Sequence, residues 1–184
     1  MTVDAELIRA AQTGDRDAFS RIAVTLARPF LAASHRILRD VHLAEDATQE
    51  ALVRIWDGLP RLRDPARFEA WAYRILVRAC AAEGGRGRAW SPNRSPLVAE
   101  IPDPSDDVRG VLDREQLERA FRRLSIEHRT VIVLRYYLDL PLDQVAEVLG
   151  IPEGTAASRL HYAIGGMRTA VDADARPPVL EATR

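Results

Sequence analysis

The chain has a single cysteine, Cys80, among its 184 residues, so it forms no intramolecular disulfide and no zinc site built from several cysteines. It has no lysine: all 26 of its basic residues are arginine. No apolar run approaches the ~18 consecutive residues expected of a membrane span. The N-terminus carries Asp4 and Glu6 instead of the basic and then apolar segments of a secretion signal. These absences predict a cytoplasmic protein without membrane insertion.

Signatures of catalysis and of metal binding are also lacking. The four histidines, at positions 35, 42, 128 and 161, include no pair at the i, i+4 spacing of a helical metal site. There is no phosphate-binding glycine loop and no nucleophile elbow. Cys80 falls on the outward side of its expected helix, with no catalytic partner nearby in sequence. The sequence therefore predicts no enzyme, no metal and no cofactor.

The composition is that of a globular protein, with 47% hydrophobic and 29% charged residues and a formal net charge of −1. Apolar residues recur at helical spacing almost throughout, and strand signals are nearly absent. The expected helices cover residues 4–12, 17–38 with an interruption at Pro29, 43–57, 65–82, 111–124, 126–138, 142–149 and 153–171. The predicted fold class is therefore all-α.

Residues 84–110 separate two groups of helices. This stretch holds four glycines and four prolines among scattered acidic residues, which is typical of a linker. We expect two small helical domains, at residues 1–85 and 111–172, joined by a flexible linker at 86–110. Residues 173–184 contain adjacent prolines and are expected to form a frayed tail.

A helix-turn-helix pattern occupies residues 142–160. A short amphipathic helix ends at Gly150, and a second helix starts near Pro152 after a tight turn. One face of the second helix offers hydroxyls, a guanidinium and an aromatic ring, which suits phosphate and base-edge contacts in a major groove. The residues on this face are Thr155, Ser158, Arg159 and Tyr162. The alternative is a helical hairpin with an ordinary polar face.

A basic segment runs from Arg61 to Arg88, with seven arginines against three acidic residues. Arginines interleaved with aromatic rings suit single-stranded or melted nucleic acid, because bases stack and phosphates pair. The candidate DNA-binding residues here are Arg61, Arg63, Arg67, Trp71, Arg74, Arg78, Arg86 and Arg88. The alternatives are a solvated surface for the arginines and a place in the core for Trp71.

The expected helix at 43–57 carries an acidic stripe opposite its apolar face. The stripe consists of Asp46, Gln49, Glu50, Val53 and Asp57. An acidic surface around one apolar residue is a candidate docking site for a basic helical partner. An ordinary solvated helix face is the alternative.

Three stretches, taken in this order around a linker, resemble the bacterial RNA polymerase sigma factors of the extracytoplasmic function group. They are Ala44-Glu-Asp-Ala-Thr-Gln-Glu-Ala-Leu-Val-Arg-Ile-Trp56, Phe68-Glu-Ala-Trp-Ala-Tyr-Arg-Ile75, and residues 124–160 with Gly154-Thr-Ala-Ala-Ser-Arg159. The resemblance covers residues 4–88 and 111–171. It implies a sigma factor that binds core RNA polymerase, directs it to promoters and helps melt promoter DNA.

The resemblance also implies partners for each part of the chain. The face from Asp46 to Asp57 would bind the polymerase β′ subunit, and the loop before Phe68 with the helix after it would open the minus-ten promoter element. The second domain would bind the β subunit and, through the helix after Gly154, the minus-thirty-five element. Control by a separate anti-sigma factor and a monomeric free state are further expectations from the resemblance.

The sequence departs from the family pattern at several positions. Arg78 stands where an asparagine is usual, Pro141 where a capping serine is common, and Ala157 where a lysine is common. Gly165-Gly166 is expected to interrupt the end of the recognition helix. Two other functions are compatible with the residues: a helix-turn-helix regulator that binds duplex DNA without polymerase, and an interaction module that has lost DNA binding.

Overall fold

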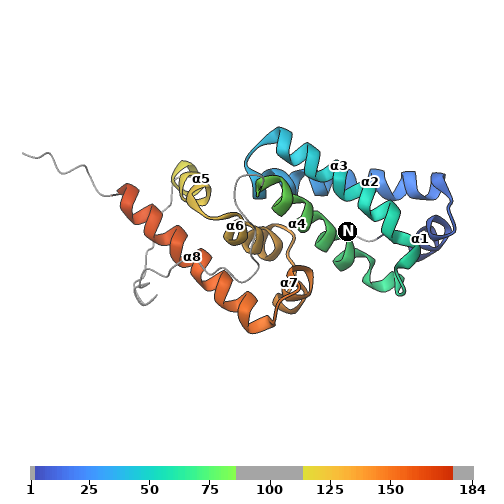
Figure 1. Cartoon of the computed structure of the whole chain (residues 1–184). Coiled ribbons are helices and arrows are strands. Elements are labelled where there is room, and N and C mark those ends of the chain that lie inside the picture. Colours follow the sequence, from blue (N-terminus) through green and yellow to red (C-terminus); the bar gives the residue numbers. More distant parts are fainter. Residues whose placement is uncertain (1–2, 86–113, 176–184) are drawn as a thin grey trace, which may run out of the picture.

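The computed structural model describes residues 3–85 and 114–175, and these residues form helices and turns without a strand (Figure 1). The α-helices are α1 (Ala5–Gln12), α2 (Arg16–Leu38), α3 (Val41–Gly58), α4 (Phe68–Gly84), α5 (Arg114–Arg123), α6 (Ile126–Ile132), α7 (Leu142–Leu149) and α8 (Glu153–Ala175). Two 3₁₀ turns, Leu59–Arg61 and Pro65–Arg67, join α3 to α4, and a π-helical turn, Val133–Tyr137, extends α6. The all-α prediction is confirmed, and the predicted linker at 86–110 lies outside the described residues.

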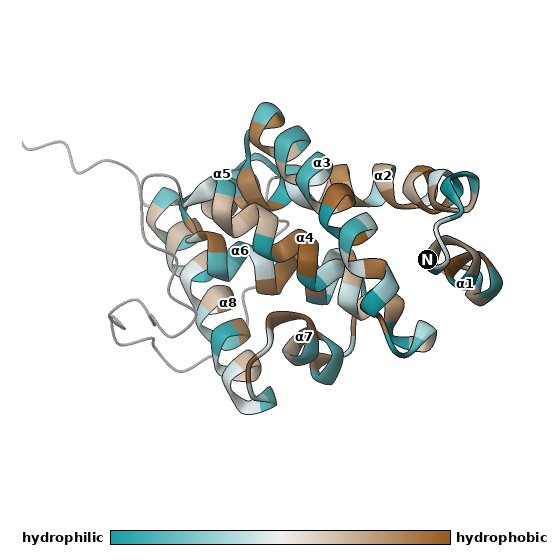
Figure 2. Ribbon diagram, turned by 45° about the vertical axis from the view of Figure 1, so that its right-hand side comes forward, coloured by the Kyte–Doolittle hydropathy of each residue, from teal (hydrophilic) through white to brown (hydrophobic). Residues whose placement is uncertain are grey.

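The helices form two units. In the N-terminal unit (residues 3–85), α3 packs against both α2 and α4, and α1 covers one end of α2. In the C-terminal unit (residues 114–175), α5, α6 and α7 all pack against the long helix α8. The units also touch each other, because α4 packs against α7 and α2 packs against α6. Figure 2 shows the hydrophobic residues of α4 near the centre of the molecule, between the two units.

Local capping chemistry fixes several helix ends. Ser125 caps α6, its Oγ accepting a hydrogen bond from the backbone N–H of His128 at 3.3 Å. Asp64 caps the turn before α4 by accepting from the N–H of Ala66 at 2.9 Å. Gly150 ends α7 in the left-handed conformation, with φ of 68°, where glycine costs little. That turn sets the angle between the two helices of the helix-turn-helix.

The interruption expected at Pro29 is wrong, because α2 continues from Arg16 to Leu38. Proline removes one helical hydrogen bond and crowds the preceding turn. Ile22, Leu26 and Phe30 lie on one stripe before and after it, and all three are fully buried. Packing on both sides of Pro29 therefore keeps the helix continuous.

Helix α8 also runs further than the sequence predicts. It passes through Gly165-Gly166 without a break, and a Cβ added at Gly166 would lie only 3.3 Å from Leu124 Cδ2. The glycine at 166 therefore lets the chain after α5 pack closely against α8. The predicted start of a frayed tail at residue 173 is wrong, because α8 continues through Asp174. The Asp174 carboxylate accepts hydrogen bonds from Arg119 and Arg123 at 3.2 and 2.8 Å.

The outward position expected for Cys80 is wrong as well. Its thiol is fully buried and lies 3.3 Å from Ser34 Oγ, which is 3.4 Å from Thr48 Oγ1. This small polar cluster joins α4, α2 and α3 inside the core. Burial raises the pKa of the Cys80 thiol to about 11, although the Ser34 hydroxyl acts in the opposite direction.

The raised pKa of the buried Cys80 thiol predicts that the folded state loses stability at alkaline pH. A native pKa of about 11 against an ordinary value of 9.0 means that the unfolded chain loses the Cys80 proton first, so stability falls as pH rises through this window. Because the chain has no lysine, few other groups titrate there: four tyrosines and the N-terminal amine. Urea unfolding between pH 8 and 11 should therefore show a steeper loss of stability for the wild type than for Cys80→Ala. Equal slopes would contradict the buried thiol.

Candidate functional site

The acidic stripe lies on the outer face of α3. Asp46, Gln49 and Asp57 are exposed, and the Val53 side chain is 50% exposed between them. Glu50 is half-buried and accepts a hydrogen bond from Arg54 Nε at 2.6 Å, so its charge is partly balanced. The opposite side of α3 is buried, as predicted. The five predicted residues therefore share one accessible face.

An apolar hollow of about 460 Å³ lies beside this face, between α2 and α3. Its walls include Phe19 and Trp56, whose ring centroids are 4.8 Å apart, together with Leu52 and Val53. Arg16, Ser20 and Gln49 complete its lining. Phe19 belongs to α2, whereas Leu52, Val53 and Trp56 belong to α3, so the periodicity of a single helix could not reveal the hollow.

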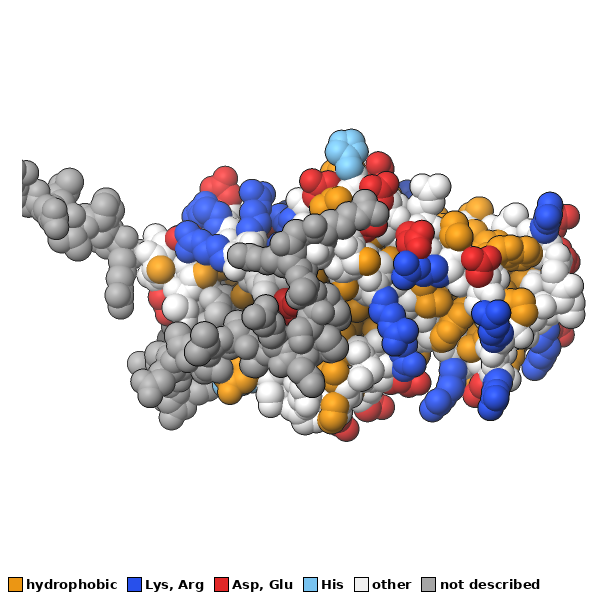
Figure 3. All heavy atoms as spheres, in the orientation of Figure 1, with side chains coloured by type: hydrophobic (Ala, Val, Ile, Leu, Met, Phe, Trp, Pro, Cys, Tyr) orange, Lys and Arg blue, Asp and Glu red, His pale blue; other side chains and the backbone are white. Residues whose placement is uncertain are grey.

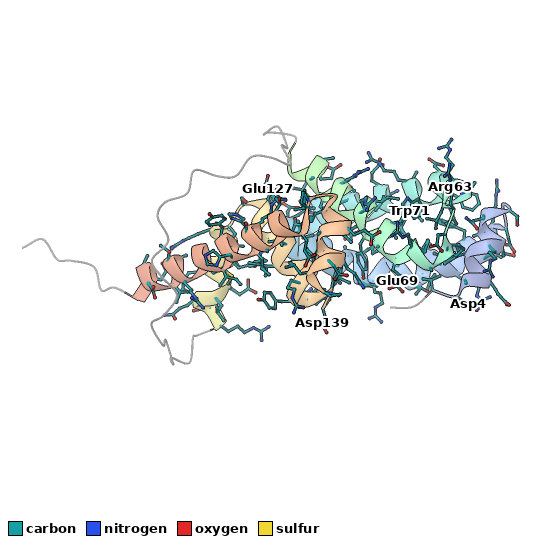
Figure 4. The ribbon with its side chains drawn as sticks, turned by 90° about the horizontal axis from the view of Figure 1, so that it is seen from below. Asp4, Arg63, Glu69, Trp71, Glu127 and Asp139 are labelled. Carbon is teal, nitrogen blue, oxygen red and sulfur yellow. The ribbon has the colours of Figure 1, made fainter. Side chains whose placement is uncertain are left out.

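The arginine-rich loop between α3 and α4 is exposed but firmly positioned. Gln12 Nε2 donates hydrogen bonds to the carbonyls of Leu59 and Leu62 at 3.1 and 2.6 Å, which ties the loop to α1. Arg61 and Arg63 are exposed, and Arg63 extends away from the ribbon in Figure 4. Figure 3 shows arginine side chains gathered around this side of the N-terminal unit. The loop therefore presents cationic groups on a fixed backbone.

Trp71 is packed and only half-exposed. A Cβ added at Gly58 would lie 2.9 Å from Trp71 Cζ2, so the ring rests against the last residue of α3. The Phe68 ring centroid lies 6.0 Å from that of Trp71. This environment agrees with the alternative that Trp71 belongs to the core. Part of its ring is still exposed near the arginine loop.

The remaining arginines of the basic segment differ in their surroundings. Arg78 is exposed, whereas Arg74 Nε and Nη2 donate to the backbone carbonyl of Glu147 at 3.1 and 2.5 Å. Arg67 Nη1 lies 3.8 Å from the Glu147 carboxylate. Two of the predicted DNA-binding side chains thus reach α7. Arg86 and Arg88 lie outside the described residues.

The exposed arc of α8 is rotated from the predicted one. Thr155 and Ser158 are exposed as expected, but Tyr162 is half-buried. Arg159 is also half-buried, and burial lowers its pKa while Glu127 of α6 acts in the opposite direction. Ala157 and His161 are exposed instead; at about 100° per residue they lie about 100° and 60° from Ser158, on the side away from Arg159 and Tyr162. Helical periodicity alone missed them because α6 covers one edge of the polar face.

Comparisons with known proteins agree with this arrangement. The family Sigma-70 region 2 matches residues 23–83, and the family Sigma-70 region 4 matches residues 114–164. The ECF RNA polymerase sigma factor SigL of Mycobacterium tuberculosis is 37% identical over 136 residues, covering 72% of this chain and 77% of SigL. The chain belongs to the extracytoplasmic function group of RNA polymerase sigma factors.

Solved structures show the same fold. CnrH, solved in complex with the cytosolic domain of CnrY, is 22% identical with a TM-score of 0.67, covering 93% of this chain and 98% of that one. The sigma factor RpoE of Bartonella quintana, solved in complex with the anti-sigma factor NepR, is 20% identical with a TM-score of 0.59, covering 85% and 98%. The match to Sigma-70 region 2 lies within the N-terminal unit, and the match to Sigma-70 region 4 lies within the C-terminal unit.

Family membership gives the activity of the whole chain. It is a sigma factor, which binds core RNA polymerase, directs it to promoters and helps to melt promoter DNA. No helix among the described residues is long and apolar enough to cross a membrane. Nor do three or more histidine, cysteine or acidic side chains gather into a metal site within residues 3–85 and 114–175.

The exposed Ala157 leads to a test of the recognition helix. Ala157→Lys should tighten binding of the full chain to a random-sequence duplex and steepen the dependence of log K on log salt by about one unit, because one phosphate contact is added. Fluorescence anisotropy across a salt series measures both quantities. Ala173→Lys is the matched control, since it adds the same charge at an exposed site near the other end of α8. Equal effects of the two changes would contradict the expectation that the exposed arc of α8 faces DNA.

Proposed function

We propose that the sigma factor uses three separate surfaces: the outer face of α3 for core polymerase, the arginine loop with α4 for the minus-ten element, and the exposed arc of α8 for the minus-thirty-five element. The observation that supports this best is that oppositely charged surfaces lie on successive elements, an acidic face on α3 and exposed arginines on the loop that follows it. Because different side chains form the two surfaces, polymerase and promoter DNA can be bound at the same time.

The α3 face has the chemistry of a polymerase-docking surface. Asp46, Gln49, Glu50, Val53 and Asp57 offer negative charge and hydrogen-bond acceptors to a basic helix. The adjoining hollow between α2 and α3 can receive an apolar side chain, and burial of such an anchor gives most of the affinity in an interface. The acidic side chains attract the basic partner during the encounter, and the hollow holds the apolar side chain of the bound partner.

The arginine surface suits melted DNA. Arg61 and Arg63 on the loop and Arg78 on α4 are exposed, so their guanidinium groups are available to phosphates. The side chain of Arg67, at the end of the same loop, is 71% exposed. A fixed cationic surface beside the partly exposed Trp71 stabilises a single strand through phosphate pairing and base stacking.

The proposed partners are core polymerase and an anti-sigma factor, and the proposed location is the cytoplasm, where promoter DNA and polymerase meet. The chain itself catalyses no reaction. The β and β′ subunits would contact regions 4 and 2, respectively, and a separate anti-sigma factor would compete for these surfaces. The solved complex of RpoE with NepR supports that last point by its fold similarity.

The polymerase surface is tested by charge reversal. Asp46→Arg with Asp57→Arg should abolish capture of the chain by immobilised core polymerase, because both side chains would repel a basic partner. Exposed substitutions of this kind change stability by only about 0.5 kcal/mol, so the variant should stay folded. The control, Glu6→Arg with Asp172→Arg, makes the same change in net charge at exposed positions of α1 and α8. Normal capture of the first variant would overturn the assignment.

The DNA surface is tested with the exposed arginines only. Replacing Arg61, Arg63 and Arg78 together by alanine should leave polymerase capture intact but prevent strand opening, as read by permanganate modification of unpaired thymines. The template is a promoter identified by run-off transcription with core polymerase and the wild-type chain. Alanine at Arg9, Arg21 and Arg28 removes the same number of exposed arginines from α1 and α2 and should have no effect. If the first variant opens the promoter normally, this arginine surface has no part in melting.

A further inference from the structure

The N-terminal turns of α8 (residues 153–161) present an exposed arc that carries no arginine. The arc consists of Gly154, Thr155, Ala157, Ser158 and His161. Arg159 lies on the next side of the helix, about 100° from Ser158, where it is half-buried and close enough to Glu127 of α6 to be influenced by its charge. The commonest specific contact in a major groove, an arginine that donates twice to guanine, therefore has no donor on this arc.

The Ser158 hydroxyl is oriented by the helix itself. Its Oγ donates to the backbone carbonyl of Gly154 at 2.9 Å, so its one proton is already used. The lone pairs of the same oxygen remain available to accept a hydrogen bond. In the major groove, adenine and cytosine present an amino group that donates, whereas guanine and thymine present carbonyl acceptors. The exposed Ser158 oxygen is therefore complementary to adenine or cytosine.

Ala157 adds an apolar group beside this acceptor. It is exposed and immediately precedes Ser158, so its methyl lies about 100° around the helix, on the side away from Arg159. His161 follows Ala157 by four residues, so its exposed ring continues the same side of the helix, where it meets the Tyr162 ring edge-on at 5.7 Å between centroids. An exposed methyl on a groove-facing helix suits the C5-methyl group of thymine.

The acceptor and the methyl together select one kind of base pair. An A·T pair presents an amino group on adenine and a methyl group on thymine, whereas a G·C pair presents an amino group on cytosine and no methyl group. We propose that α8 reads A·T base pairs in the minus-thirty-five element, with Ser158 Oγ accepting from the adenine amino group and the Ala157 methyl packing on the thymine methyl. This inference rests on the proposed function, in which the exposed arc of α8 faces this element.

These contacts give an order of preference among the bases that face Ser158. Adenine with its thymine partner satisfies both contacts. Cytosine keeps the hydrogen bond but loses the methyl contact, which weakens binding about fourfold if the methyl is worth one buried CH₂ group. Guanine brings its O6 acceptor to an oxygen whose proton is engaged with Gly154, so neither group donates. Arg168, exposed on the same side of α8, is eleven residues beyond Ala157, about 16 Å along the axis, and so suits a phosphate instead of this base pair.

The first test measures the base preference of the holoenzyme. Core polymerase with the full chain transcribes barcoded templates made from a promoter identified by run-off transcription, with the minus-thirty-five element randomised, and the barcodes are sequenced. The wild type should enrich A·T at one position or at two adjacent ones. Ala157→Arg should replace this preference by G·C, because an arginine there can donate twice to guanine. Ala173→Arg is the matched control: it adds the same charge at an exposed site near the other end of α8 and should leave the preference unchanged.

The second test removes the thymine methyl alone. Deoxyuridine in place of thymidine at the selected pair keeps its base pairing but lacks the C5-methyl, so holoenzyme binding to the promoter duplex, measured by fluorescence anisotropy, should weaken about fourfold. Ala157→Gly removes the methyl on the protein side and should bind the two duplexes equally. Because this result is a ratio of two duplexes for one protein, any effect of glycine on α8 itself cancels. Ser158→Ala should keep the sensitivity to the methyl and lose discrimination between adenine and guanine.

The two tests separate failure of this inference from failure of the proposed function. Equal binding of the two duplexes by the wild type would overturn the reading of A·T pairs. Enrichment of G·C by the wild type at the positions that Ala157→Arg changes would also overturn it. If Ala157→Arg changes the preference at no position of the element more than Ala173→Arg does, the exposed arc of α8 does not face this element, and the proposed function of α8 is itself wrong.

Discussion

The burial of α4 on two sides is the constraint on which the rest of the structure depends. One side of this helix completes the core that α2 and α3 begin, and the other side receives α7. Tyr73 illustrates both roles: its ring centroid lies 5.4 Å from that of Phe30 of α2, and it is close enough to Tyr137 to be influenced by it. Burial, followed by Glu69 and Tyr137, raises the pKa of Tyr73 to about 12. The helix proposed to open DNA is thus also the helix that joins the two regions.

Sequence reasoning succeeded where the controlling interactions are local. The caps at Asp64 and Ser125, the left-handed turn at Gly150 and the bounds of α7 follow from residues within a few positions of each other. The core side of α3 also followed from periodicity, because a single face of that helix is buried. The candidate surface on α3 was found for the same reason, because it lies on the side of the helix opposite the buried face.

Sequence reasoning failed where an element has a second neighbour that is distant in sequence. Cys80 looked exposed because the sequence of α4 gives no sign that α2 and α3 also cover this side of the helix, where Ser34 and Thr48 lie. Arg159 looked like part of the groove-facing arc because nothing in α8 itself signals that Glu127 of α6 lies close by. Arg74 looked free for the same reason. Each error came from long-range packing, and the errors at Arg159 and Arg74 change which side chains are available to DNA.

The arginine-only composition suits both the contacts between the two units and the proposed contacts with DNA. A guanidinium offers several N–H donors in a plane, stacks on aromatic rings and stays charged when it is partly buried, whereas an ammonium group does none of these equally well. Arg74 uses two donors on one carbonyl, and Arg36 uses its face on Tyr137. The same features bind phosphates and stack on bases. Because the contacts between the units and the proposed DNA contacts use the same kind of group, an arginine engaged in the first, such as Arg74, is not free for the second.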